Sequence, residues 1–166
     1  TDASLLVRSL LALNDADLGV QRTGVLVMYA HAPAHESTTD HSNLESYLRI
    51  GQLLDDIVAN LRRVPNVVAA GSVMGLPTGQ YGSNGTYAVD GVHPHSAGLH
   101  AGFRLAGPGY FQTLGIPLVH GRDFDGGDTY DREPVAIISQ ALARQSFGDR
   151  NPLGQRIMCG LDRSDV

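Results

Sequence analysis

The clearest pattern in the chain is a helical repeat of apolar residues between positions 42 and 64. Apolar side chains recur there at three- and four-residue spacings, which places them on one face of a helix. Ser42 and Glu45 have the spacing of a capping box, and Pro65 ends the pattern. The sequence therefore predicts an amphipathic helix over 42–64. Its apolar face consists of Leu44, Tyr47, Leu48, Leu54, Ile57, Val58 and Leu61.

Short apolar runs lie on both sides of this predicted helix, at residues 24–29 and 67–74. Uncharged runs of this length are typical of strands that are covered on both faces. A helical crossover makes the two strands that it connects parallel. The pattern therefore predicts a strand, helix, strand unit across 24–74, with a turn at Pro65–Asn66 before the second strand.

The last third of the chain repeats these signals. The apolar run 135–138 predicts a third core strand, and Ser139 is placed to cap a helix over 140–147. Gly148 is the expected end of that helix, and the segment that follows predicts a strand near Ile157.

Between these regions, glycine and proline dominate the pattern. Asn84–Gly85 is a strong signal for a hairpin turn, and residues 101–106 predict a short strand. The run 107–124 has glycines at 107, 109, 115 and 121, alternating with prolines and aromatic residues. Because glycine permits positive φ and proline fixes φ, this run predicts a loop, a single helical turn, a second loop and a short edge strand.

The first apolar segment, Ser4 to Leu13, is helical in pattern and carries Arg8 in its middle. It is shorter than the about twenty apolar residues that cross a bilayer. Two interpretations stay open: an amphipathic helix that packs on this domain, or the outer end of a transmembrane helix. At the other end, Val166 follows no capping element, so we expect a further part of the domain to follow.

Composition narrows the function classes. The chain has 166 residues and a formal net charge of −5, and all twelve of its cationic side chains are arginine. The acidic balance and the absence of a basic stripe argue against a nucleic-acid partner. Without lysine there is no P-loop lysine and no Schiff base. Cys159 is the single cysteine, which leaves the redox compartment undetermined.

No residue set has the spacing of a catalytic, cofactor or metal site. The histidines at 31, 35 and 41 and at 93, 95 and 100 fall in loop-like sequence without matching ligands. The acidic run from Asp123 has the wrong register for a calcium loop, because its twelfth position is Pro134. Ser72 and Ser139 lack the surroundings of a nucleophile elbow. We therefore predict no catalytic, cofactor-binding or metal-binding residues.

Six motifs together resemble the extracytoplasmic core domain of MacB-like permeases in the FtsX-like group, most closely the large permeases of acidobacteria and their relatives. The motifs lie at 67–77, 108–111, 114–117, 121–124, 135–144 and 151–154, and the likeness covers roughly residues 5 to 157. Each motif alone is short, but their order and spacing are specific.

The resemblance implies an α+β fold with a ferredoxin-like βαβ lobe and an inserted or adjoining β-rich lobe. It implies that 1–20 is the end of the first transmembrane helix with its turn, and that 21–166 is the periplasmic core domain, truncated at the C-terminus. The α/β lobe would take about 24–74 and 135–157, and the β-rich lobe about 78–130. We expect Gly109, Gly115 and Gly121 to hold turns, Tyr110 and Phe111 to anchor the short helix, and Arg122 to tie its loop.

The function implied is non-catalytic. The domain would belong to a permease of the bacterial inner membrane, lie in the periplasm and transmit motion when a cytoplasmic ABC ATPase subunit cycles. Its expected partners are the transmembrane segments of the same permease, that ATPase and a periplasmic partner protein, with no nucleic acid and no cofactor. A ligand-binding sensor domain and, less favoured, a hydrolase are the alternatives.

Overall fold

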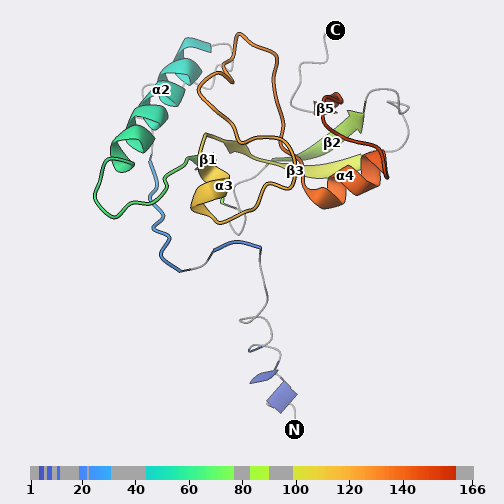
Figure 1. The fold of residues 1–166 in the computed structure, drawn as a ribbon, viewed down its shortest axis with the longest axis horizontal. Helices are drawn as coiled ribbons and strands as arrows, with labels where there is room; N and C mark the ends of the chain where they lie inside the picture. The colour runs from blue at the N-terminus through green and yellow to red at the C-terminus, as the bar shows by residue number, and fades with distance from the viewer. Residues whose placement is uncertain are drawn as a thin grey trace.

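The fold is of the predicted α+β class, with two small antiparallel sheets (Figure 1). The computed structural model describes residues 4–5, 7–8, 11, 19–21, 23–30, 44–76, 83–89 and 99–159. In Figure 1, α3 and the strand β1 lie between α2 on one side and the larger sheet with α4 on the other.

Helix α2 spans Leu44–Leu61 and confirms the main helical prediction, although it ends three residues before Val64. Its last turn tightens, because Arg63 N donates to Asn60 O and Val64 N donates to Leu61 O. Asn66 then has a φ of 69°, which confirms the predicted turn. The predicted capping box lies outside the described residues.

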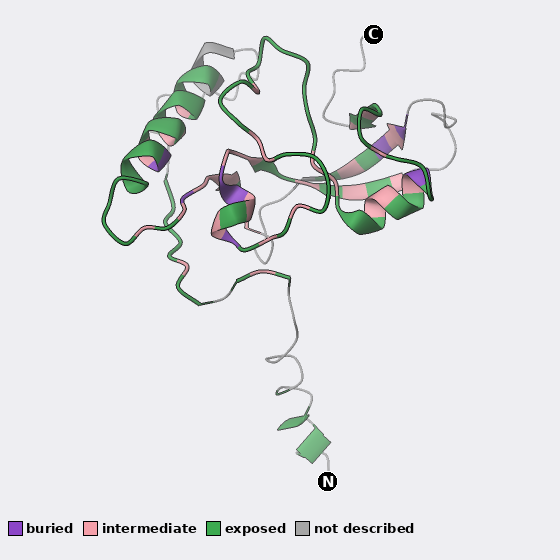
Figure 2. Ribbon diagram, viewed as in Figure 1, coloured by how far each residue is buried: buried purple, intermediate pink, exposed green. Residues whose placement is uncertain are grey.

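The larger sheet contains β2 (Ser83–Val89), β3 (Leu99–Phe103) and β5 (Ile157–Cys159), in the order β3-β2-β5 with antiparallel pairing. Helix α4 (Gln140–Phe147) packs on this sheet, and the buried cluster there consists of Tyr87, Val89 and Phe147 (Figure 2). The predicted caps of α4 are confirmed, since Ser139 Oγ accepts from Leu142 N and Gly148 ends the helix. The strand predicted near Ile157 is confirmed as well.

The smaller sheet pairs β1 (Val73–Met74) with β4 (Leu105–Ala106). It continues past its last pair, because Gly107 N donates to Ser72 O at 2.9 Å. The chain then enters α3 (Tyr110–Thr113), which is the single helical turn that the glycine and proline pattern predicts. This sheet therefore fixes where α3 begins.

Two predicted core strands are wrong, and a third is present only at its end. Residues 24–29 and 135–138 form no strand, and only the last two residues of 67–74 do, so the described residues contain no parallel strand, helix, strand unit. Leu26 and Val68 are each 93% exposed. The backbone before β1 is engaged elsewhere, because Ala70 O accepts from Arg62. An apolar run forms a strand only where the N–H and C=O groups of another strand are placed to hydrogen-bond with its backbone.

The predicted hairpin turn at Asn84–Gly85 is also wrong, because both residues lie within β2 and pair with β3. Gly85 pairs with Ala101, and a Cβ at Gly85 would lie 3.1 Å from the Phe103 ring. The missing side chain thus leaves room for an aromatic ring across the strands. The strand predicted at 101–106 is present as β3 and β4.

Residues 4, 5, 7, 8 and 11 have helical backbone, as predicted for the first segment, and Leu5, Val7 and Leu11 are each more than half exposed. In the part of the chain that the structure describes, no helix combines the length and apolar character needed to cross a membrane.

Candidate functional site

The residues around the start of α3 form a junction where four parts of the chain meet. We call this set, consisting of Arg62, Ala70, Pro108, Gly109 and Asp123, the α3 junction. It joins the end of α2, the segment before β1, the turn before α3 and the acidic loop that follows. The five residues come from separate segments, so the junction forms only when the chain folds and brings these segments together.

Arg62 directly follows α2 and reaches two carbonyl groups. Its Nε and Nη2 atoms donate to Ala70 O at 3.1 and 2.8 Å, and Nη2 also donates to Pro108 O at 2.8 Å. Hydrogen bonds from a guanidinium are charge-assisted and stronger than neutral ones. One side chain therefore holds the end of a helix to two separate segments.

Glycine makes the close approach of these segments feasible. Gly109 has a φ of 82°, and a Cβ there would overlap the Arg62 guanidinium and lie 2.6 Å from Ala70 O. A Cβ at Gly71 would lie 2.6 Å from the carbonyl carbon of Gly109. Both contacts need a residue without a side chain.

Asp123 holds the same turn from another side. Its Oδ2 atom accepts from Gly109 N at 3.2 Å, and its Oδ1 atom accepts from Phe124 N at 2.8 Å. Gly109 O in turn accepts from the backbone N and the hydroxyl of Thr113, at 2.9 and 2.7 Å. Gly109, the residue that precedes α3, is therefore bonded through both of its backbone polar groups.

The opposite end of α3 is held by the N-terminal part of the chain. Gln21 N donates to Leu114 O at 2.7 Å, and Leu114 is buried. Gly115 has a φ of 64°, and a Cβ there would lie 3.2 Å from the Cβ atom of Gln21. Helix α3 thus connects the segment near residue 21 to the end of α2.

The aromatic anchor of α3 is confirmed. Tyr110 is 8% exposed and makes an edge-to-face contact with Phe111, with ring centroids 5.1 Å apart. Phe111 is half-buried, and its ring lies 6.2 Å from that of Phe124. Burial raises the pKa of the Tyr110 hydroxyl, and the nearby charge of Arg104 opposes that shift. The turn roles of the three glycines are confirmed too, because Gly109, Gly115 and Gly121 all have positive φ.

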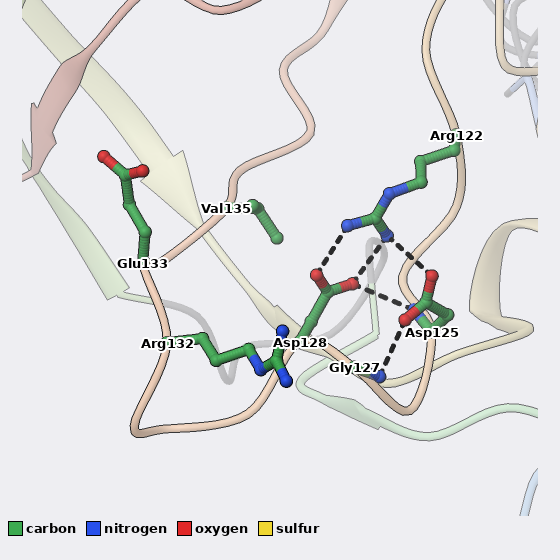
Figure 3. A pocket seen from close by; sticks show the side chains of 7 residues that line it. All are labelled: Arg122, Asp125, Gly127, Asp128, Arg132, Glu133 and Val135. Atoms are coloured by element: carbon green, nitrogen blue, oxygen red, sulfur yellow. Dashed lines mark hydrogen bonds and ion pairs between the residues drawn. The ribbon is translucent and has the colours of Figure 1, made fainter.

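Arg122 ties the acidic loop, as predicted (Figure 3). Its Nη1 and Nη2 atoms donate to the two carboxylate oxygens of Asp128 at 2.7 and 2.6 Å, and Nη1 lies 3.2 Å from the carboxylate of Asp125. The hydrogen bond from Arg122, with a second from Asp125 N, lowers the pKa of the Asp128 carboxyl to about 2. The same pairing with Asp128 raises the pKa of Arg122. The Thr129 hydroxyl similarly lowers the pKa of Asp131.

Two hollows adjoin these residues. One, of about 520 Å³, lies over the α3 junction and is lined in part by Arg62, Gln112 and Phe124. The other, of about 550 Å³, lies at the acidic loop and is lined by Arg122, Asp125, Gly127, Asp128, Arg132, Glu133 and Val135 (Figure 3). Among the described residues, the buried side chains are apolar or tyrosine, and no tyrosine lines either hollow. Neither hollow therefore holds the desolvated polar groups of a typical small-molecule site.

The serines and histidines considered as nucleophiles or metal ligands do not form a catalytic or metal-binding arrangement among the described residues. Ser139 caps α4, and Ser72 Oγ lies where a Cβ at Gly107 would approach it to 2.5 Å. His100 is on β3 and exposed, whereas the other five histidines considered as ligands fall outside the described residues. Over the ranges that the structure covers, no three His, Cys, Asp or Glu side chains form a metal-binding group.

Sequence reasoning missed the roles of Arg62, Asp123 and Gln21. Arg62 and Arg63 both look like cations in the last turn of a helix, and no local signal separates them. Gly71 is the one sequence feature that could have indicated the junction, because an isolated glycine within an apolar run is typical of a close approach between backbone segments.

One of the comparisons with known proteins identifies a family. The family model for the MacB-like periplasmic core domain matches residues 4–164, which is nearly the whole chain. No curated protein and no solved structure matches the chain.

Proposed function

The chain belongs to the family of MacB-like periplasmic core domains, which are extracytoplasmic domains of ABC-type permeases, and from this premise we propose that it transmits motion outside the membrane. The family implies an inner-membrane permease with a periplasmic domain and an ABC ATPase partner. In our proposal the domain performs no chemistry itself, and ATP hydrolysis belongs to another polypeptide.

The single observation that supports transmission is the double attachment of α3. The bond from Gln21 N to Leu114 O connects α3 to the N-terminal segment, which we propose is the outer end of the first transmembrane helix over residues 1–20. At its other end, Arg62 and Asp123 connect α3 to α2 and to the acidic loop. A displacement of the membrane end would therefore reach both segments through one short, bonded helix.

We further propose that the two-lobe organisation expected for the family applies here. An α/β lobe would take about 24–74 and 135–157, and a β-rich lobe about 78–130. The pairing of β5 with β2 and the packing of α4 on the same sheet would join the C-terminal part of the first lobe firmly to the second.

The partners proposed are the transmembrane segments of the same permease, the cytoplasmic ABC ATPase and a periplasmic partner protein. Crosslinking followed by pull-down of the full-length permease tests them. A matched control replaces residues 21–159 by a flexible linker. We expect the ATPase to co-purify with both proteins and the periplasmic partner with the intact permease alone. If no ATPase co-purifies with the intact permease, the proposed function is wrong.

No observation favours the alternative of a ligand-binding sensor. Such a domain needs a concave pocket with convergent polar groups, usually desolvated so that they discriminate between ligands. The residues lining the hollow at the acidic loop are exposed or half-buried, and Arg122 is already paired with Asp125 and Asp128 there.

A further inference from the structure

Residues Gly107 to Tyr110 form a tight turn directly before α3. Tyr110 N donates to Gly107 O at 3.3 Å, and Gly109 has a φ of 82° and a ψ of −1°. These are the angles of the third residue of a type II turn, with Pro108 at its favoured second position. Type I differs from type II by rotation of the central peptide group alone, so the same turn-closing hydrogen bond fits both.

Two charged side chains hold this central peptide group from opposite sides. Its carbonyl oxygen, on Pro108, accepts from Arg62 Nη2 at 2.8 Å, and its N–H, on Gly109, donates to Asp123 Oδ2 at 3.2 Å. The C=O and N–H of a trans peptide point in opposite directions. Rotation of the group therefore turns both away from their partners and breaks both hydrogen bonds at once.

We propose that the Pro108–Gly109 peptide group is a conformational switch that couples α2 to α3, with Arg62 and Asp123 as the residues that hold it in the coupled state. After rotation, Arg62 keeps its bonds to Ala70 O but no longer bonds the turn that leads into α3. The use of this switch in transmission rests on the proposed function, whereas its existence rests on the geometry of the turn.

The residue types fit this role. The planar guanidinium of Arg62 bonds two carbonyl groups 38 positions apart in the chain (108 − 70) through neighbouring nitrogen atoms. The ammonium of lysine is a point charge on a flexible stem and lacks this fork. Glycine at position 109 is required only for the type II state, because type I needs a negative φ that any residue adopts. Alanine at this position should therefore favour the rotated, uncoupled state.

The test measures the distance between α2 and α3 in the full-length permease. Spin labels are introduced as unnatural amino acids at Asp56 and Gln112, both exposed, and the distance is read by pulsed electron paramagnetic resonance. We expect one narrow distance distribution in the parent protein. Arg62→Ala and Gly109→Ala should both broaden it and shift it to the same second distance. Arg63→Ala is the matched control, because among the described residues the Arg63 side chain bonds Asn60 in its own turn and does not reach the turn before α3. It should reproduce the parent.

The outcomes separate cleanly. An unchanged distribution in Arg62→Ala overturns the proposal, and so does a second distance that appears equally in Arg63→Ala. Circular dichroism checks that each variant is folded, and Arg62→Lys, which is expected to give an intermediate distribution, replaces Arg62→Ala if that variant fails to fold. The distance measurement needs no ATPase, so loss of the switch and loss of the proposed function are distinguishable.

Discussion

At the scale of single residues, glycines with the same sign of φ have different reasons to be glycine. Gly109 and Gly154 both have positive φ, at 82° and 75°. A Cβ at Gly109 would overlap Arg62, whereas a Cβ at Gly154 would meet nothing within 4 Å. A side chain at Gly154 would therefore introduce backbone strain alone, whereas a side chain at Gly109 would introduce both strain and a steric clash.

We expect Gly154→Ala to cost about 1 kcal/mol of the free energy of unfolding, which is the usual penalty for a left-handed residue that is not glycine. Gly109→Ala should cost at least about 1 kcal/mol more, because it also disrupts the hydrogen bonds of the α3 junction. Urea unfolding curves for the two variants measure the difference. Equal losses would contradict a tightly packed junction.

The Arg122–Asp128 pair makes a residue-scale prediction about pH. The pKa of Asp128 falls from the ordinary 3.8 to about 2, because Arg122 and a backbone N–H stabilise the ionised carboxylate. A lowered pKa in the folded state stabilises the protein above the ordinary pKa, and that contribution is lost as the pH falls through about 2. An NMR titration of the Asp128 carboxyl should show a midpoint near 2.

Arg122→Ala should return that midpoint towards 3.8, the ordinary value. Arg132→Ala is the control, since Arg132 lines the same hollow without a described ion pair to Asp128. If Arg132→Ala raised the midpoint as much as Arg122→Ala, general charge in the loop and not the specific pair would explain the shift.

At the scale of elements, the sequence predicted the helices much better than the strands. Helix α4 carries its own caps, and α2 carries a long periodic face, so both are specified locally. A strand needs partners that are distant in the chain, and the same apolar pattern is compatible with several pairings. Residues 135–138 illustrate this, because Ile138 packs against the core although its segment is not a strand.

Leucine substitutions test the corrected role of residues 24–29. Leu26 is 93% exposed and Leu114 is 9% exposed. We expect Leu114→Ala to reduce the free energy of unfolding by about 2–5 kcal/mol and Leu26→Ala to change it by less than about 0.5 kcal/mol. Urea unfolding followed by circular dichroism gives both values. If Leu26→Ala reduced the free energy of unfolding by several kcal/mol, Leu26 would have to be buried, as the core strand predicted from the apolar pattern requires.

At the scale of the whole molecule, family membership could be predicted from the sequence, but the α3 junction could not. The motifs at 108–111 and 121–124 mark the chain segments that contribute to it, and their glycines indicate turns. Nothing local shows that Arg62, and not Arg63, reaches Pro108 across 46 positions. Nor does local sequence single out Asp123 from the other acidic residues of its loop. Long-range contacts of this kind depend on how the elements pack.

The last prediction concerns whether the N-terminal segment and α3 move as one body in the working permease. A Cβ at Gly115 would lie 3.2 Å from the Cβ of Gln21, near the about 3.5–4.5 Å that a disulfide spans. Gln21→Cys with Gly115→Cys should therefore crosslink on oxidation. Since the proposed function needs this contact to stay closed, ATP hydrolysis by the permease with its ATPase should be the same before and after oxidation.

The single variant Gly115→Cys, treated with the same oxidant, controls for strain at a φ of 64° and for reaction at Cys159. Mass spectrometry establishes how much of the double variant is crosslinked. If oxidation abolished ATP hydrolysis and a reductant restored it, the N-terminal segment would have to slide along α3 during the cycle. Motion would then have to be transmitted through another contact, because a contact between Gln21 and α3 that breaks in every cycle cannot transmit a displacement from residue 21 to Arg62.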